Sequence, residues 1–312
     1  MSNLTPEVTI SAAYTPAQTA ELVCRIGVQK GHLRPEKVFL SAISAGCILS
    51  FGCAVSLTAM TAPWFQDNAP GLIKLIGAFV FPLGLVVIVL TGADLFTSTN
   101  MFTAVAVLHR RLPAWRMLLH WFLCFFGNLL GSLFVMAIIV GYGGIFDAKI
   151  YKDEVIAFTT KKQLDPQWHQ IFIRAIGCNW LVCLACFLAT QAKDMVSKIA
   201  GMWLPIFAFV ALGFDHVVAN MFFMPLGIWM GTPGLTVGLY IYKGMIPALL
   251  GNIIGGSLFC GVYFWWMYLV TESTMGADEQ ASPGILAGRT KATASDEESK
   301  VDLPSTAQQA SS

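Results

Sequence analysis

The sequence predicts an all-α membrane protein, a six-span bundle built from two inverted three-helix repeats whose helices 2 and 5 are broken. First, 56% of the 312 residues are hydrophobic and 12% are charged, which is more apolar surface than one soluble core needs. Second, the charges gather in residues 1–37, 107–116, 145–165 and 272–312, leaving long apolar stretches between them. Third, two of these stretches are about twice the roughly 20 residues that cross a bilayer, and polar residues interrupt both.

The elements follow in chain order. Residues 1–37 form an N-terminal segment, in which Thr15-Pro16 opens a short interfacial helix over 15–33. Residues 38–271 form the six-span domain. Its spans are expected at about 38–61, 71–108, 115–140, 170–190, 202–242 and 245–270, with a turn-rich connection at 63–70 and a polar loop of about 28 residues after the third span. Residues 272–312 are rich in Ser, Ala, Asp, Glu and Lys, which predicts a disordered tail.

Two similar polar segments interrupt the second and fifth apolar stretches. They are Gly92–Phe102 and Gly213–Phe222, with breaks expected at 91–100 and 213–220. Polar side chains at bilayer depth are expensive and persist mainly where they face a pathway or a bound solute. Asp94 and Asp215 each follow a break and are expected to cap the next half-helix, and Asn100 and Asn220 support the same breaks. The chain is therefore a candidate transporter or channel.

A repeat relates the two halves. Gly127–Ser132 in the third span matches Gly251–Gly256 in the sixth, and Gly46-Cys47 weakly matches Gly177-Cys178. Because each half has three spans, the second enters the bilayer from the opposite face and the broken helices meet near the midplane. Their N-termini carry unpaired N–H groups that suit an anion. The small residues of the Gly-Asn motifs are interpreted as close helix packing.

His216 stands where the other repeat has Leu95. A buried histidine is often a hydrogen-bonded core residue, but this departure from the repeat lies in a helix break. Packing does not explain it readily, so a functional role for His216 is expected.

The distribution of charged and cysteine residues predicts the orientation of the chain in the membrane and argues against other functions. Twelve of the 19 Lys and Arg residues fall on the side of the N-terminus, so both termini are expected in the cytoplasm. A net charge of +1 gives no footprint for nucleic acid. Cys183 and Cys186 form a CxxC pair without a second pair, which favours packing over metal chemistry. No nucleophile and base, metal set or phosphate loop is evident, so neither an enzyme nor a cofactor is expected.

Three motifs resemble the signatures of the formate/nitrite transporter family. They are Thr91–Thr99, Gly177–Ala185 and Gly213–Phe222, and Gly251–Gly256 agrees with them. The similarity covers about residues 15–271. It implies an aquaporin-like fold, a homopentamer with one pore per protomer, and a mobile loop at Thr91–Thr99.

The resemblance also implies roles for individual residues. Phe81, Leu85, Leu95, Phe96 and Phe209 fall at two hydrophobic constrictions, and Thr97, Asn179 and His216 at polar positions between them. Lys162 is the nearest match to a lysine that draws in anions, with Lys161 as the alternative. Asp215 stands where many members have Glu.

The expected function is uptake of a small monovalent weak acid through the plasma membrane, coupled to protons at His216. A bare anion loses its hydration between apolar rings, whereas the neutral acid loses much less. Nitrite is expected over formate, because Ser295 in the acidic tail resembles a phosphorylation site of a eukaryotic uptake protein serving nitrate assimilation. The alternatives are transport of formate or another short monocarboxylate, an anion channel without protonation, and an aquaporin-like neutral pore.

Overall fold

A computed structural model describes residues 13–270 of the chain. The predictions for the tail over 272–312, Ser295 included, and for residues 1–12 lie outside the described residues. Most of the described residues are helical, and six helical stretches are long and apolar enough to cross a membrane.

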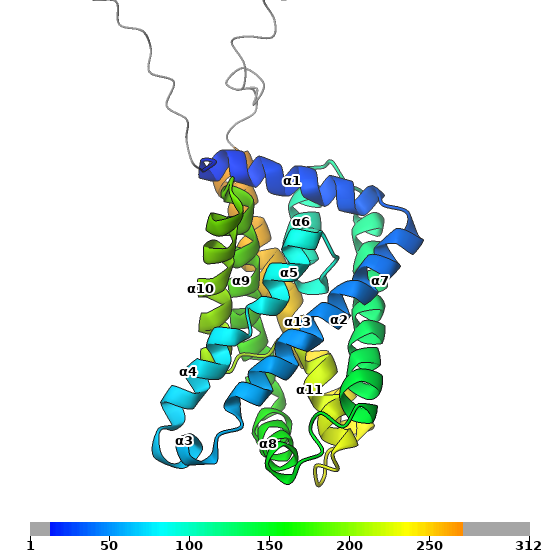
Figure 1. Ribbon diagram of the computed structural model, residues 1–312. Helices are drawn as coiled ribbons and strands as arrows, with labels where there is room; N and C mark the ends of the chain where they lie inside the picture. The colour runs from blue at the N-terminus through cyan, green and yellow to red at the C-terminus, as the bar shows by residue number, and fades with distance from the viewer. Residues whose placement is uncertain (1–12, 271–312) are drawn as a thin grey trace, which may run out of the picture. The chain divides into compact units, whose positions relative to one another are not determined.

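The first half begins with a helix that lies across one end of the bundle, and three spans follow it (Figure 1). Its helices are α1 (Pro16–His32), α2 (Pro35–Met60), α3 (Pro63–Asn68), α4 (Pro70–Val80), α5 (Leu83–Thr91), α6 (Phe96–Leu108) and α7 (Ala114–Phe134), which continues as the π-helical η1 (Val135–Tyr142). Thr15 caps α1 with a capping box closed by Gln18.

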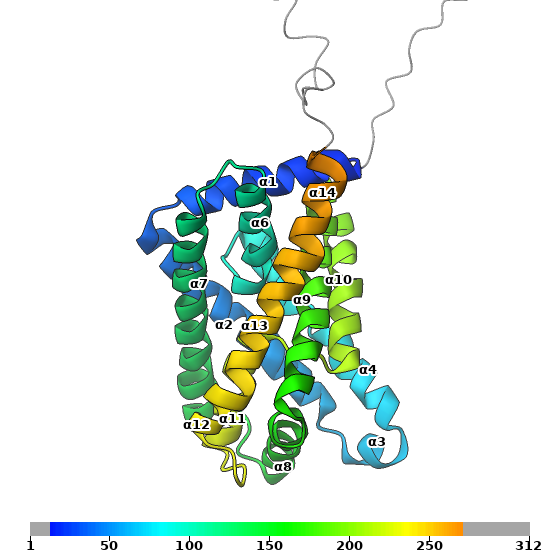
Figure 2. The same ribbon diagram turned by 180° about the vertical axis from the view of Figure 1, so that it is seen from behind.

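The second half repeats this plan (Figure 2). Its helices are α8 (Lys149–Thr159), η2 (Thr160–Leu164), α9 (Trp168–Gln191), α10 (Met195–Leu212), α11 (Val217–Trp229), α12 (Val237–Leu239), η3 (Tyr240–Met245), α13 (Ile246–Ile254), η4 (Gly255–Val262) and α14 (Tyr263–Leu269). The last five form one span, Val237–Leu269.

Three expected boundaries are wrong. The polar loop after the third span contains the helices α8 and η2. The fifth apolar stretch ends at Trp229 rather than near residue 242, because Gly231 and Gly234 make turns with positive φ and the sixth span begins at Val237. The segment Gly231–Gly234 holds two glycines and a proline, which is a turn signal, although long apolar stretches lie on both sides of it.

The two breaks are also shorter than expected, at residues 92–95 and 213–216. Gly92 and Gly213 end α5 and α10 in the left-handed conformation, with φ of 77° and 74°. The chain turns once and resumes a helix within four residues. Asn100 and Asn220 therefore lie on α6 and α11, not in the breaks.

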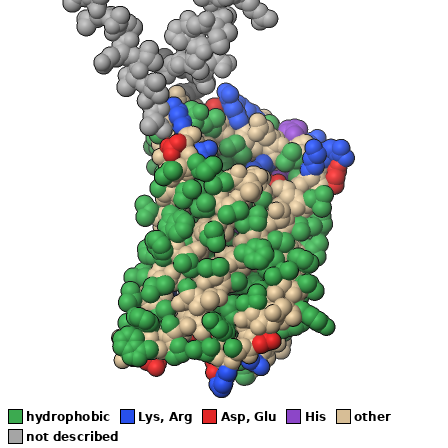
Figure 3. All heavy atoms as spheres, in the orientation of Figure 1, with side chains coloured by type: hydrophobic (Ala, Val, Ile, Leu, Met, Phe, Trp, Pro, Cys, Tyr) green, Lys and Arg blue, Asp and Glu red, His purple; other side chains and the backbone are tan. Residues whose placement is uncertain are grey.

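The half-helices α6 and α11 point toward opposite ends of the bundle (Figures 1 and 2). We call these the α1 end, which α1 crosses, and the α8 end. Charged side chains gather mainly at the two ends of the face in Figure 3, and hydrophobic side chains cover the zone between them. This distribution suits a bilayer-spanning bundle.

Candidate functional site

Asn128 and Asn252 hold the start of the two half-helices. The amide oxygen of Asn128 accepts the Phe96 N–H at 2.8 Å, and that of Asn252 accepts the Val217 N–H at 2.8 Å. Both asparagines are fully buried. They satisfy backbone donors that a helix start leaves open.

The same amides also bind the carbonyl groups around each break. Asn128 Nδ2 donates to Ala42 O at 2.7 Å and Asp94 O at 2.9 Å. Asn252 Nδ2 donates to Ala175 O at 2.8 Å and Asp215 O at 3.0 Å. The matching bonds make Ala42 and Ala175 equivalent in the two repeats. The echo predicted between Gly46-Cys47 and Gly177-Cys178 is therefore wrong by two residues, since Gly46 corresponds to Asn179.

The capping role expected of Asp94 and Asp215 is wrong. The N-cap positions belong to Leu95, which makes no side-chain cap, and to His216, which does. Both carboxylates instead bind cations.

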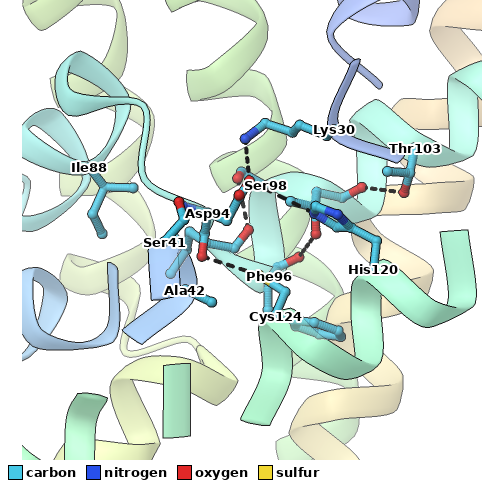
Figure 4. Close-up of polar contacts among 12 residues, drawn as sticks. Lys30, Ser41, Ala42, Ile88, Asp94, Phe96, Ser98, Thr103, His120 and Cys124 are labelled. Carbon is cyan, nitrogen blue, oxygen red and sulfur yellow. Dashed lines mark hydrogen bonds and ion pairs between the residues drawn. The ribbon is translucent and has the colours of Figure 1, made fainter. Parts of the chain in front are cut away.

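Asp94 lies in a polar cluster at the α1 end (Figure 4). Its carboxylate accepts a hydrogen bond from Lys30 of α1, and its backbone N–H donates to Ser41 Oγ of α2 at 3.0 Å. His120 of α7 places Nε2 3.8 Å from Asp94 Oδ1. The carboxylate is 1% exposed, so Lys30 compensates a buried charge.

Asp215 has two full cations. Lys162 Nζ lies 3.1 Å from its Oδ1, and Arg174 Nε lies 2.9 Å from its Oδ2. Lys162 also donates to Gly213 O at 2.9 Å and Phe214 O at 2.5 Å. Lys162, rather than Lys161, therefore contacts the break.

His216 and Thr97 join the two half-helices. Nε2 of His216 is 2.9 Å from Thr97 Oγ1, and Nδ1 accepts the Ala219 N–H at 3.0 Å. Because Nδ1 accepts, a neutral imidazole has its proton on Nε2 and donates it to Thr97. Both side chains are buried where the two repeats meet.

A cavity of about 90 Å³ at the α8 end reaches His216. Phe81 and Phe209 line it, with ring centroids 5.7 Å apart in an edge-to-face pair, and the Phe209 ring stacks on His216 at 5.9 Å. Lys74 and Lys162 also line it. The cavity thus contains cations, an aromatic pair and the imidazole.

A larger cavity of about 480 Å³ lies at the α1 end. Lys30, Lys193 and Lys198 line it, together with Ser98 of α6 and Gly92 of the first break. The two cavities share no lining residue.

The other predicted pathway residues line neither of these cavities. Leu85, Leu95 and Phe96 are buried, and the Phe96 ring packs against Phe125 of α7 with centroids 5.5 Å apart. Asn179 Nδ2 bonds Thr97 O at 3.1 Å, Asn100 Oδ1 at 3.1 Å and Asn252 O at 2.6 Å. Its amide therefore joins helices and leaves no donor free. Asn220 lines the smaller cavity and donates to Asp215 Oδ1 at 3.4 Å.

The family model described as "Formate/nitrite transporter" matches residues 17–266. This chain belongs to the formate/nitrite transporter family. It is 36% identical to a "Probable formate transporter" of Methanothermobacter thermautotrophicus, covering 83% of this chain and 98% of that protein. It is 33% identical to "Formate channel BtFdhC" of Bacillus thuringiensis, covering 85% and 99%.

Solved structures agree with this assignment. A "Pentameric formate channel with formate bound" has a TM-score of 0.66 and 30% identity, covering 75% of this chain and 98% of that one. An "FNT family ion channel" has a TM-score of 0.71 and 25% identity, covering 80% and 98%. The chain is thus a multi-pass membrane protein of an anion-transport family whose matched members are transporters and channels rather than enzymes.

Sequence reasoning missed five residues of this site, namely Lys30, Ser41, His120, Arg174 and Lys74. Lys30 lies on α1 and Arg174 on α9, far along the chain from the breaks that hold Asp94 and Asp215, so no local spacing marks these pairings. His120 carried the clearest signal, as a histidine inside an apolar span.

Proposed function

We propose that this chain carries a small monovalent weak-acid anion across the plasma membrane together with a proton, which the anion takes up beside His216. The arrangement of the smaller cavity supports this most directly. Lys162 attracts the anion, Phe81 and Phe209 remove its water, and His216 turns its Nε2–H from Thr97 to the anion.

The chemistry follows from desolvation. An anion between apolar rings becomes more basic, because burial disfavours its charged form. It accepts a proton that enters as hydronium, giving the neutral acid and one water. The Nε2–H of His216 and the Thr97 hydroxyl stabilise the anion until the proton arrives. The neutral acid then passes Leu85, Leu95 and Phe96 at low desolvation cost.

Formate is the first substrate to test, because the names of several relatives specify formate. Nitrite, predicted from the tail, is the second. Apolar constrictions separate such similar small acids poorly, so transport of both is consistent with the proposal. We further propose a homopentamer, by analogy with the similar pentameric formate channel, with both termini in the cytoplasm.

Uptake of labelled formate and nitrite into proteoliposomes across a range of pH tests this function. The variant His216→Phe is expected to lose proton-coupled uptake, whereas His169→Asn, at an exposed position on α9, should behave like the wild type. Retention of the wild-type pH dependence by His216→Phe contradicts the proposal.

A second candidate is conduction of the anion without protonation, which the word "channel" in several relatives' names favours. His216 then supplies a hydrogen bond alone. Recording current during flux separates the two, since electroneutral flux supports proton coupling and one charge per anion supports a channel.

A further inference from the structure

His120 is a buried titratable group that the proposed transport step does not use. It lies on α7 with 3% of its surface exposed, and neither ring nitrogen has a hydrogen-bond partner among the described residues. Figure 4 shows the ring directed toward Asp94, whose Oδ1 is 3.8 Å from Nε2. An unbonded imidazole in a buried site is costly, which calls for a physical reason.

Within residues 13–270, few charged or titratable groups face this ring. Asp94 approaches from the first break and Lys30 from α1. On α7 itself, Cys124 donates to Asp94 O at 3.1 Å, and Arg116, one turn before His120, donates to Gly31 O at 3.4 Å. The polar side chains that α2 and α6 contribute here carry hydroxyl groups, those of Ser41, Ser98 and Thr103 among them.

The cluster around Asp215 has a different net charge from the cluster around Asp94. Asp215 pairs with two permanent cations, Lys162 and Arg174, so that cluster has a net charge of about +1. Asp94 pairs with Lys30, and this cluster is neutral while His120 is neutral. Protonation of His120 gives it the same net charge as its counterpart.

Lys30 connects the charge of the Asp94 cluster to the larger cavity. It bonds Asp94 and also lines the 480 Å³ cavity, whereas His120 does not line that cavity. A charge change at His120 therefore acts on the cavity through Asp94 and Lys30.

We propose that His120 is a positioning residue that makes anion capture at the α1 end dependent on pH. When the imidazole takes a proton from hydronium and releases one water, the imidazolium shares the Asp94 carboxylate. Lys30 is then no longer fully neutralised and presents its ammonium to the larger cavity. Acid on this side gathers the anion and supplies the proton that the anion needs. This inference rests on the proposed function.

Kinetics from one side of the membrane test it. Proteoliposomes are oriented through an N-terminal affinity tag, and KM for formate is measured from the α1 end at pH 5.5 and pH 8. The variant His120→Asn is expected to raise KM about fivefold at pH 5.5, as loss of one partly screened charge would do, and to match the wild type at pH 8. From the α8 end, KM should not change at either pH.

Two further variants provide controls. His32→Asn changes an exposed histidine at the end of α1 and should leave the pH profile intact. Lys30→Gln should remove the pH effect, and adding His120→Asn to it should raise KM no further, because both changes interrupt one path.

The outcomes separate the two proposals. If the wild type carries no anion at any pH, the proposed function and this inference both fail. If His216→Phe loses proton coupling while His120→Asn keeps the wild-type pH dependence of KM, the function stands and the inference is wrong.

A spectroscopic measurement covers the case in which His120→Asn does not fold. The pair His120-Trp121 is unique in the sequence, so carbonyl-labelled His and amide-labelled Trp assign its signal in the wild-type protein. Nitrogen shifts of that ring should report conversion to imidazolium between pH 8 and pH 5.5. A ring that stays neutral over this range overturns the inference.

Discussion

The clusters around Asp94 and Asp215 have the same backbone plan and different charges. In both, an asparagine of the third span in the repeat caps the half-helix and binds the carbonyl before the cap. Asp94 then meets one lysine and a histidine, whereas Asp215 meets a lysine and an arginine. The two repeats thus share the asparagine bonds that build the breaks. They differ in the charged side chains around the aspartates.

The largest expected effect comes from removing the Asp215 charge. Asp215→Asn leaves Lys162 and Arg174 without their carboxylate and should cost about 4 kcal/mol of unfolding free energy, because breaking a buried pair strands a charge. Asp94→Asn should cost less, since it strands Lys30 alone. Denaturation in detergent measures both, and equal losses would contradict the assigned charge difference.

Removal of the asparagine caps should lower the free energy of unfolding nearly as much as Asp215→Asn does. The loss should be the same at both breaks. Asn128→Ala and Asn252→Ala each strand a buried N–H and two carbonyls, for a loss of about 3 kcal/mol. Thermal unfolding is the measurement. Asn68→Ala, at an exposed position on α3, serves as the control and should lose little. A large difference between the two cap variants would show that the breaks are not equivalent.

A smaller effect is expected from the lysine at the α8 end. Lys162→Gln should raise KM from that end about fivefold, because it removes the cation beside the smaller cavity. Lys161→Gln, one residue earlier, is the matched control and should change KM less. The reverse order would move the anion-attracting role to Lys161.

The smallest effects concern one carboxylate on each surface helix. Partial burial alone would raise the pKa of Glu21 on α1, but hydrogen bonds from Arg25 and Arg111 outweigh it and hold the pKa below its usual value. Burial raises the pKa of Glu154 on α8, against a hydrogen bond from Gln66 at 2.5 Å.

The stability consequences therefore have opposite signs. Glu21 stabilises the fold above its unfolded pKa, and this contribution is lost as pH falls through its folded pKa. Glu154 opposes folding at neutral pH, and the cost disappears as pH falls through its raised pKa. At pH 7, Glu21→Gln should lower the free energy of unfolding and Glu154→Gln should raise it, each by under about 1 kcal/mol. Denaturation at pH 7 and pH 4.5 checks both, and shifts of the same sign would refute the contrast.

Sequence patterns predicted the bundle well because hydropathy and the two polar segments report directly on spans and breaks. The alignment of Leu95 with His216 is confirmed, since they are the N-caps of α6 and α11. The hydropathy pattern missed the turn after Trp229, because this turn is short and apolar residues flank it on both sides, although Gly231, Pro233 and Gly234 mark it in the sequence.

The charged partners of Asp94 and Asp215 could not be predicted from the sequence, for a different reason. Lys30 precedes Asp94 by 64 residues, and Arg174 precedes Asp215 by 41 residues. Such pairings depend on how α1 and α9 pack, which no local spacing encodes. Capping was assigned to Asp94 and Asp215 because they adjoin the breaks, although distant asparagines perform it.

Asn179 has a mechanical consequence. One amide of α9 binds Thr97 and Asn100 in the first repeat and Asn252 in the second. A side chain at Gly256 would come within 2.5 Å of that amide, so the glycine leaves it room. Because Asn252 in turn accepts the Val217 N–H, one chain of hydrogen bonds links the half-helix α6 to the start of the half-helix α11.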